Sequence, residues 1–469
     1  MADSESKNPS PFSVPNVRWF VAFRILFNAR FYYPIFAVLF LDFGLTSQQF
    51  ALLNAAWAAA IVILEVPSGA VADTIGRRNL LRVCAVLMVA EMAILTFTPR
   101  GDPTLLFYLF LLNRILSGAA EAAASGADEA LAYDSLEKAG LSDQWSRVLE
   151  VLMRWQSVAF VGALALGGIL YDQSLMQSAV NAVGLDWEVS KNLTMRLPIA
   201  LVFLQSLGVL GVTLQMREVE GEEERQGRAE EAQCSRWEYT RRTAAKAFKT
   251  TLQAGGWILK TPFATVIILY GFLFDSIIRV FLTFNSQYYR VIELPEASFG
   301  MIGAAFATVG ILVPKAARYL AENHTPVFNT GFLFVLAFLG LGGLMFPMPI
   351  WGLLPVIPLM AVMYFLNYFL SHYLNRITSS KQRATVLSFR GLAFNLAYGL
   401  VGALYAGVLS ILHHPVAQAH PDLEGTALED QVFAASLNTW LPWFCFTMGI
   451  ATVFAAWRLR GRKDHRKVE

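Results

Sequence analysis

The stretch Glu65-Val-Pro-Ser-Gly-Ala-Val-Ala-Asp-Thr-Ile-Gly-Arg-Arg78 marks a point where a long apolar run ends and the chain turns back. Gly69 and its alanine neighbours allow a second helix to approach closely, and Gly76 allows a tight turn. Asp73 can pair with Arg77 four residues further on. Small side chains, a turn and a basic cluster in this order are typical of a membrane helix that ends on the positively charged side of the bilayer.

The composition of the whole chain is that of a polytopic membrane protein. Of 469 residues, 55% are hydrophobic and only 15% are charged, whereas about a quarter of a soluble protein is charged. Mean hydropathy is +0.47. The net charge is +2, and basic residues form short clusters between apolar runs, so we expect no nucleic-acid partner. The three cysteines are widely spaced and predict neither a disulfide nor a metal site.

Twelve apolar runs are long enough to cross a membrane, which takes about 20 residues each. A polar linker divides them six and six, and Arg147/Arg154 and Arg383/Arg390 open the fifth and eleventh runs with the same spacing. We therefore predict an all-α polytopic membrane protein with twelve transmembrane helices in two pseudo-symmetric six-helix bundles. The runs are 19–41, 49–72, 80–97, 105–130, 149–171, 197–216, 262–289, 299–320, 328–346, 349–374, 384–412 and 432–457.

The predicted organisation is an N-terminal tail (1–18), a first bundle (19–216), a linker (217–261), a second bundle (262–457) and a basic tail (458–469). The second part of the linker, 237–257, has the pattern of a basic amphipathic helix that lies on anionic headgroups. Lys and Arg gather in the linker, the C-terminal tail and one set of loops. This bias predicts that both termini and the linker are cytoplasmic. We expect the protein to be a multi-pass protein of the plasma (inner) membrane of the cell.

Ionisable residues inside the predicted spans indicate a polar interior. Each would cost about 2.5–3.5 kcal/mol at the centre of the bilayer if it faced lipid. We therefore expect most of them to face each other or a hydrated cavity between the two bundles. They are Arg24, Arg30, Glu65, Glu91, Arg114, Glu121, Asp128, Glu129, Arg154, Asp275, Arg279 and Arg390.

The fourth run is the most informative of these segments. Arg114, Glu121 and Asp128 recur at every seventh residue, which places them on one face of a continuous helix. We predict that Asp128 pairs with Arg154 near the cytoplasmic mouth, with Glu129 as the alternative partner of Arg154. A buried Arg–Glu pair that only fixes helix packing is the alternative interpretation of the stripe.

The seventh run carries Asp275 and Arg279 four residues apart, a spacing at which they can pair. Asp275 is our second candidate for a group that exchanges protons. Polar residues of the first and eleventh runs that could also reach the cavity are Arg24, Asn28 and Arg390.

The pattern from Gly69 to Arg78 resembles the signature of the loop between helices 2 and 3 in the major facilitator superfamily of transporters. The resemblance implies that Gly69, Asp73, Gly76, Arg77 and Arg78 form a cytoplasmic gate. The sequence Arg114-x-x-Ser-Gly-x-Ala is similar to the helix 4 motif of that family, with Ser117 in place of the usual glutamine. In relatives with this motif, the arginine takes part in proton coupling through a nearby carboxylate. The third helix is usually peripheral there, which implies a structural or interfacial role for Glu91.

One departure limits the resemblance to drug antiporters. Their helix 5 usually carries Gly-x-x-x-Gly-Pro-x-x-Gly-Gly, and here Leu164 stands where the proline would be, although Gly167 and Gly168 are present. The runs Glu65-Val-Pro-Ser-Gly and 127–135 resemble a branch of bacterial multidrug-type and uncharacterised permeases.

These features together predict a secondary active transporter, a monomer in the lipid bilayer, that moves a small, amphipathic organic solute by alternating access. We expect proton-coupled export without a cofactor, and a sodium gradient is the alternative driving force. An importer or ion-independent facilitator of an anionic solute held by the arginines is a second possibility. A non-transporting receptor or scaffold is a third. An enzyme is disfavoured because the chain has no H-E-x-x-H, G-x-S-x-G or P-loop motif.

Overall fold

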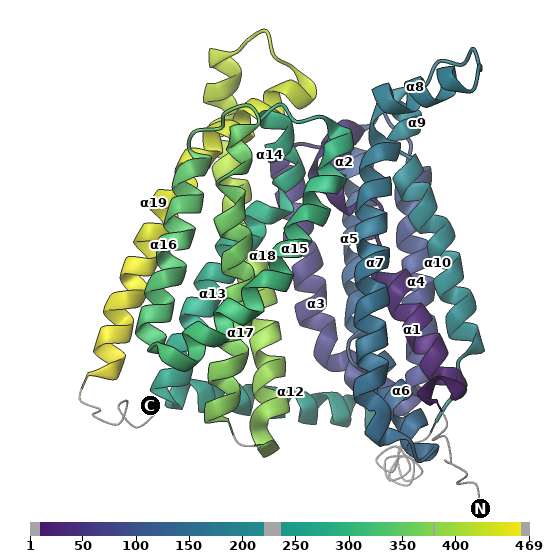
Figure 1. Cartoon of the computed structure of the whole chain (residues 1–469), viewed down its shortest axis with the longest axis vertical. Coiled ribbons are helices and arrows are strands. Elements are labelled where there is room, and N and C mark those ends of the chain that lie inside the picture. Colours follow the sequence, from purple (N-terminus) through teal and green to yellow (C-terminus); the bar gives the residue numbers. More distant parts are fainter. Residues whose placement is uncertain (1–9, 220–235, 379, 461–469) are drawn as a thin grey trace, which may run out of the picture.

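The computed structural model describes residues 10–219, 236–378 and 380–460. A few side chains within these ranges, including those of Asp73 and Arg383, lie outside the described part. Twelve of the described helices are long and apolar enough to cross a membrane, which confirms the predicted fold class. Figure 1 shows two groups of long helices side by side, with the first and last spans both reaching the end of the molecule where α12 lies.

The first half of the chain contains six spans. Proline at the first position starts α5, and the Asp102 side chain accepts hydrogen bonds from the backbone N–H groups of Thr104 and Leu105, which caps that helix. Thr46 and Gln49 form a capping box at the start of α3. The helices are α1 (Pro15–Asn28) with α2 (Phe36–Phe43), α3 (Ser47–Ile75), α4 (Arg77–Phe97), α5 (Pro103–Ala124) with α6 (Ala127–Lys138), α7 (Trp145–Tyr171), and α10 (Leu197–Gln215), and the short α8 (Gln173–Ala182) and α9 (Lys191–Thr194) precede α10.

The second half repeats the architecture with six further spans. Proline again occupies the first position of α13 and of α16, where its missing N–H costs nothing. The helices are α13 (Pro262–Thr283), the short α14 (Asn285–Val291), α15 (Glu296–Asn323), α16 (Pro326–Leu344), α17 (Val356–Ile377), α18 (Ser380–Ala419) and α19 (Gly425–Leu459).

Between the halves, α12 (Arg236–Lys260) lies across one end of the molecule and packs against α3, α13 and α18. Thr74 and Thr240 are hydrogen-bonded at 2.8 Å between α3 and α12. Phe389 of α18 lies so close to Gly255 of α12 that a Cβ atom there would come within 2.5 Å of the ring. We call this end of the molecule the α12 end. Helix α12 contacts helices from both halves and therefore bridges the two halves.

The two halves meet along α3 with α18 and along α7 with α15. The contact between α7 and α15 is backbone against backbone: a Cβ atom on Gly300 would lie 1.9 Å from the carbonyl oxygen of Leu164. Further along, Phe284 of the second half meets the Phe50 ring of α3 at 4.9 Å between centroids. These contacts lie toward the end opposite α12, so the halves are closed against each other there.

The fourth span differs from the continuous helix that the sequence predicted. Helix α5 stops at Ala124, Gly126 adopts a left-handed backbone conformation with φ of 77°, and α6 begins at Ala127. Because α6 packs against α1 and α4, the stripe of Arg114, Glu121 and Asp128 is interrupted before its last member.

Candidate functional site

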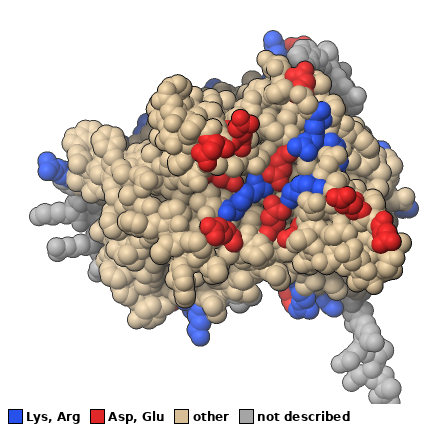
Figure 2. Space-filling view, turned by 90° about the horizontal axis from the view of Figure 1, so that it is seen from above, with Lys and Arg blue, Asp and Glu red and all other residues tan. Residues whose placement is uncertain are grey.

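The end opposite α12 is closed by charged residues from both halves. Arg290 of α14 binds Asp42 of α2 at 2.8 Å and Glu296 of α15 at 3.2 Å. Lys191 of α9 also pairs with Glu296 and lies 3.7 Å from Asp42, and Asp430 of α19 is 4.0 Å from Arg290. We call these five residues the charge cluster. Figure 2 shows acidic and basic side chains alternating across the middle of this face.

Electrostatic coupling within the charge cluster is strong. Burial alone would lower the pKa of Arg290, but Asp42, Asp430 and Glu296 raise the pKa of this guanidinium above its ordinary value. The hydroxyl of Tyr171 donates a hydrogen bond to Asp42 at 2.5 Å. Each ion pair that joins the halves must break before this end can open.

Asp172 adds a second link between the halves at this end. Its carboxylate caps α8 by accepting from Leu175 N at 2.9 Å, and it accepts from Ala297 N of α15 at 3.1 Å. Burial raises the pKa of Asp172, but these hydrogen bonds and one from Ser174 outweigh burial and leave the pKa below its ordinary value. Asp172 therefore stays ionised.

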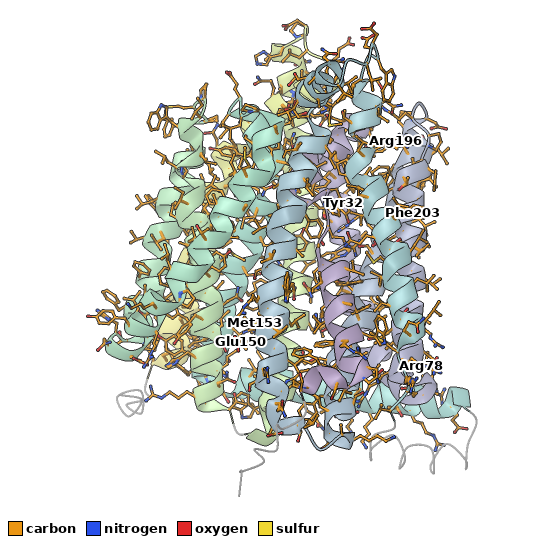
Figure 3. The ribbon with its side chains drawn as sticks, turned by 45° about the vertical axis from the view of Figure 1, so that its right-hand side comes forward. Tyr32, Arg78, Glu150, Met153, Arg196 and Phe203 are labelled. Carbon is orange, nitrogen blue, oxygen red and sulfur yellow. The ribbon has the colours of Figure 1, made fainter. Side chains whose placement is uncertain are left out.

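A cavity of about 490 Å³ lies between the halves, away from the charge cluster. Three residues of the predicted pathway line it: Arg114 and Glu121 of α5, and Arg279 of α13. Aromatic side chains from both halves complete the wall, and Tyr32, which Figure 3 labels, is one of them. The aromatic lining residues are Tyr32, Tyr33, Phe36, Trp57, Phe160, Phe299, Tyr364 and Tyr398.

Asp128 and Arg154 do not pair, so that prediction is wrong. Arg24 binds Asp128 at 2.6 Å and lies 3.9 Å from Glu129. Arg154 is exposed and pairs with Glu150, one turn earlier on α7, at 2.9 Å. Figure 3 labels Glu150 and Met153 on this part of α7, toward the α12 end. The physical reason is the break at Gly126, since α6 packs against α1 and so carries Asp128 to Arg24.

Asp275 and Arg279 form the predicted pair, with 3.0 Å between Asp275 Oδ2 and Arg279 Nη2. Arg279 lines the cavity, whereas Asp275 and two other candidates, Asn28 and Arg390, are not among its lining residues. Asn28 donates to the backbone oxygen of Arg24 within α1 at 2.8 Å, and the Arg390 guanidinium lies 5.9 Å from the Phe394 ring centroid on its own helix.

Arg30 and Asn54, which were not among the predicted pathway residues, complete the site. Arg30 lines the cavity and forms an ion pair with Glu91 at 2.7 Å, and both side chains are buried. Asn54 of α3 also lines the cavity and accepts from Arg114. Arg30 follows α1 in the turn around residues 29–32. Its position inside an apolar run was the one available signal.

The expected gate motif is only partly assembled. Gly76 has φ of 91° and ends α3, as a turn requires, and Arg77 pairs with Asp134 of α6. Arg78 lies 3.7 Å from Glu218 at the α12 end, where Figure 3 labels it. Gly69 is exposed, and no described atom lies within 4 Å of its Cβ position, so it makes no close helix contact in this conformation. The Asp73 side chain lies outside the described residues.

Two helical halves around a central cavity define a polytopic membrane protein built for solute passage. The sequence pattern of the Major Facilitator Superfamily matches residues 18–402. The chain belongs to the Major Facilitator Superfamily. No curated protein sequence matched it.

Solved structures of transporters share the fold at low sequence identity. A bacterial homologue of the human lysosomal transporter Spinster, described as inward-facing and occupied, is 15% identical with a TM-score of 0.67, over 98% of this chain and 99% of that one. The nucleoside transporter NupG is 14% identical with a TM-score of 0.62, over 97% and 100%. The xylose transporter XylE from E. coli is 13% identical with a TM-score of 0.55, over 97% and 100%. Its membership of the Major Facilitator Superfamily makes the chain a secondary transporter that works by alternating access.

Proposed function

We propose that the protein exports a small, amphipathic organic solute by proton-coupled transport across the plasma membrane. In a cell with two membranes this is the inner membrane. The observation that carries the proposal is the cavity between the halves, where buried charges and aromatic rings lie together. A wall of aromatic and other apolar side chains with a few polar groups is the usual lining of a site for a small organic molecule. The volume of about 490 Å³ is also in the range of such sites.

Orientation follows from the basic residues at the α12 end. Arg241, Arg242 and Lys246 are exposed on α12, and Arg458 of α19 donates to the backbone oxygen of Leu259 there. Basic residues remain on the cytoplasmic side of membranes. With the α12 end in the cytoplasm, the charge cluster closes the outer end, and the conformation is inward-facing.

Glu121 is the proposed proton carrier. It lines the cavity, and the described ion pairs include none to its carboxylate. Asp275 is the second candidate, although Arg279 holds it in an ion pair. A carboxylate that faces a solute site can exchange its proton as the solute binds or leaves. Export is the direction that the resemblance to multidrug-type permeases favours.

Purified protein in vesicles tests this proposal. We would impose proton gradients of each sign and follow ethidium, an amphipathic cation, and phenyl phosphate, an anion, with protein-free vesicles as the control. We expect a solute to move against its gradient only when protons move the opposite way. Glu121→Gln should remove the gradient dependence, and Arg318→Gln, an exposed change on α15, should keep it. Co-movement of solute and protons would instead support the importer, and binding without movement would contradict transport of these probes.

A further inference from the structure

One buried guanidinium in the central cavity forms no ion pair with any acid in the described part of the chain. The Arg114 side chain is about 6% exposed and lines the cavity. Its Nη2 donates to Asn54 Oδ1 at 3.3 Å, and its Nε has no hydrogen-bond partner in the described part of the chain. The ion pairs found there include none to Arg114. A buried charge without a counter-ion destabilises the fold, and an anionic ligand would offset that cost.

The surroundings of Arg114 stabilise a cation only in part. Its guanidinium lies 5.2 Å from the Phe36 ring centroid and 5.3 Å from that of Trp57. Aromatic faces at such distances attract a cation through the quadrupole of the ring, but they do not neutralise its charge. Arg30, which is equally buried on the same cavity, has Glu91 at 2.7 Å. Arg114 has no carboxylate at such a distance among the described ion pairs, although Glu121 lies two turns away on the same helix and lines the same cavity.

A second guanidinium approaches from the other half. Arg279 is held by Asp275 at 3.0 Å, by the backbone oxygen of Phe394 at 2.7 Å and by Asn395 Oδ1 at 3.1 Å. Its Nε has no hydrogen-bond partner among the residues that the structure describes. It lies 4.5 Å from the Tyr398 ring centroid. The Tyr398 ring in turn meets the Trp57 ring edge to face, at 6.3 Å. Arg114 and Arg279 therefore flank one ring contact that joins the two halves.

We infer that the transported solute carries an anionic group, a carboxylate or a phosphate, which binds Arg114 and reaches toward Arg279, with an apolar body on the aromatic wall. Planar guanidinium N–H groups match the oxygens of both anions. An anion held from α5 of one half and α13 of the other draws the halves together as it binds. The inference rests on the proposed function only in taking the cavity as the solute site.

Binding to purified protein in detergent tests the inference without any transport. The probes share a phenyl group and differ in charge: 3-phenylpropionate and phenyl phosphate as anions, 3-phenylpropylammonium as the cation, and 3-phenylpropanamide as the neutral analogue. The readout is the shift of the thermal unfolding midpoint with probe concentration. We expect at least one anion to raise the midpoint and the cation and the amide to leave it unchanged. The anion that raises the unfolding midpoint identifies the anionic group of the solute as a carboxylate or a phosphate.

Substitutions separate binding from folding. Arg114→Gln should weaken anion binding at least about tenfold, the loss expected for one charge-assisted hydrogen bond, and Arg114→Lys should weaken it less. Without a probe, Arg114→Gln should unfold no earlier than the parent, because it removes an unpaired buried charge. Arg318→Gln, an exposed change outside the cavity, should bind as the parent does.

Several results would overturn the inference. They are equal stabilisation by the cation or the amide, unchanged anion binding in Arg114→Gln, an earlier unfolding of that variant without probe, or no shift with either anion. Gradient-driven export of ethidium together with no anion binding would leave the proposed function standing and remove this inference. Anion binding without any gradient-dependent transport would leave this inference standing and contradict the proposed function.

Discussion

Two buried arginines of the same cavity show what a charge in the interior of this protein needs. Arg30 has a full counter-ion in Glu91, and both side chains are buried. Arg114 has an amide and two aromatic faces. Removing one member of a buried ion pair leaves the other charge uncompensated, whereas removing an unpaired charge does not. The two positions should therefore respond in opposite ways to neutral substitution.

Glu91→Gln is expected to destabilise the protein by about 3–5 kcal/mol, because it leaves the Arg30 guanidinium buried without its carboxylate. Thermal unfolding of the purified protein measures the change. The double variant with Arg30→Met and Glu91→Met should recover much of the loss, because neither charge is then left alone. Arg318→Ala breaks the exposed Arg318–Glu322 pair and should leave the unfolding midpoint unchanged. A Glu91→Gln variant as stable as the parent would show that the pair is not structural.

Helices α7 and α15 approach each other more closely than side chains would allow. Gly300 lies against the carbonyl of Leu164, and Gly168 lies against the backbone of Gly300 and Ala297. Without side chains in between, backbones can pack directly, as they do in tightly packed membrane helices. Helix α7 lacks the proline of the drug-antiporter pattern, and it runs unbroken from Trp145 to Tyr171. Glycine packing, rather than a kink, lets it reach the other half.

Gly300→Ala is expected to push α15 away from α7, because the new Cβ atom would lie 1.9 Å from the Leu164 oxygen. Overpacking of this kind costs about 1–3 kcal/mol, and thermal unfolding measures it. Gly162→Ala, on the helix that Gly300 contacts, is the matched control because no described atom lies within 4 Å of its Cβ position. The control should be neutral or gain up to about 1 kcal/mol in helix stability. Equal behaviour of the two variants would mean that the close approach does not stabilise the structure.

The molecule as a whole is closed at one end by ion pairs and helix contacts. Helix α12 lies across the other end (Figure 1). Arg290 is central to the closed end because it contacts acids from α2, α15 and α19. Alternating access requires this end to open while the α12 end closes. The stability of the charge cluster therefore sets the population of the two states.

Arg290→Gln should shift the population toward the state that is open at the charge cluster, since Asp42 and Glu296 lose one of the two cations that they share and keep only Lys191. A single cysteine in the cavity, Asn54→Cys in a variant without the three native cysteines, reports the change. A membrane-impermeant thiol reagent added from the charge-cluster side should label it several-fold faster in Arg290→Gln. Arg318→Gln, outside the charge cluster, should leave the rate unchanged. An unchanged labelling rate in Arg290→Gln would contradict a gating role for the cluster.

The amino-acid sequence by itself determined the twelve spans, because a membrane helix needs a long apolar run and each run is local in the chain. The Asp275–Arg279 pair was also predictable, since one turn of helix separates the two residues. The partner of Asp128 was not, because a left-handed residue at Gly126 redirects α6 by an amount that the spacing of residues does not encode.

Only the tertiary structure decided which charges meet across the halves. Asp42 and Arg290 are far apart in the sequence, as are Trp57 and Tyr398, and their contacts depend on how two bundles pack against each other. The lack of an ion pair to Arg114 among the described residues is of the same kind, since it depends on where acids from distant segments lie. Local patterns fix helices because hydrogen bonds and hydrophobic periodicity act within a few residues, whereas a binding site is set by contacts between distant segments.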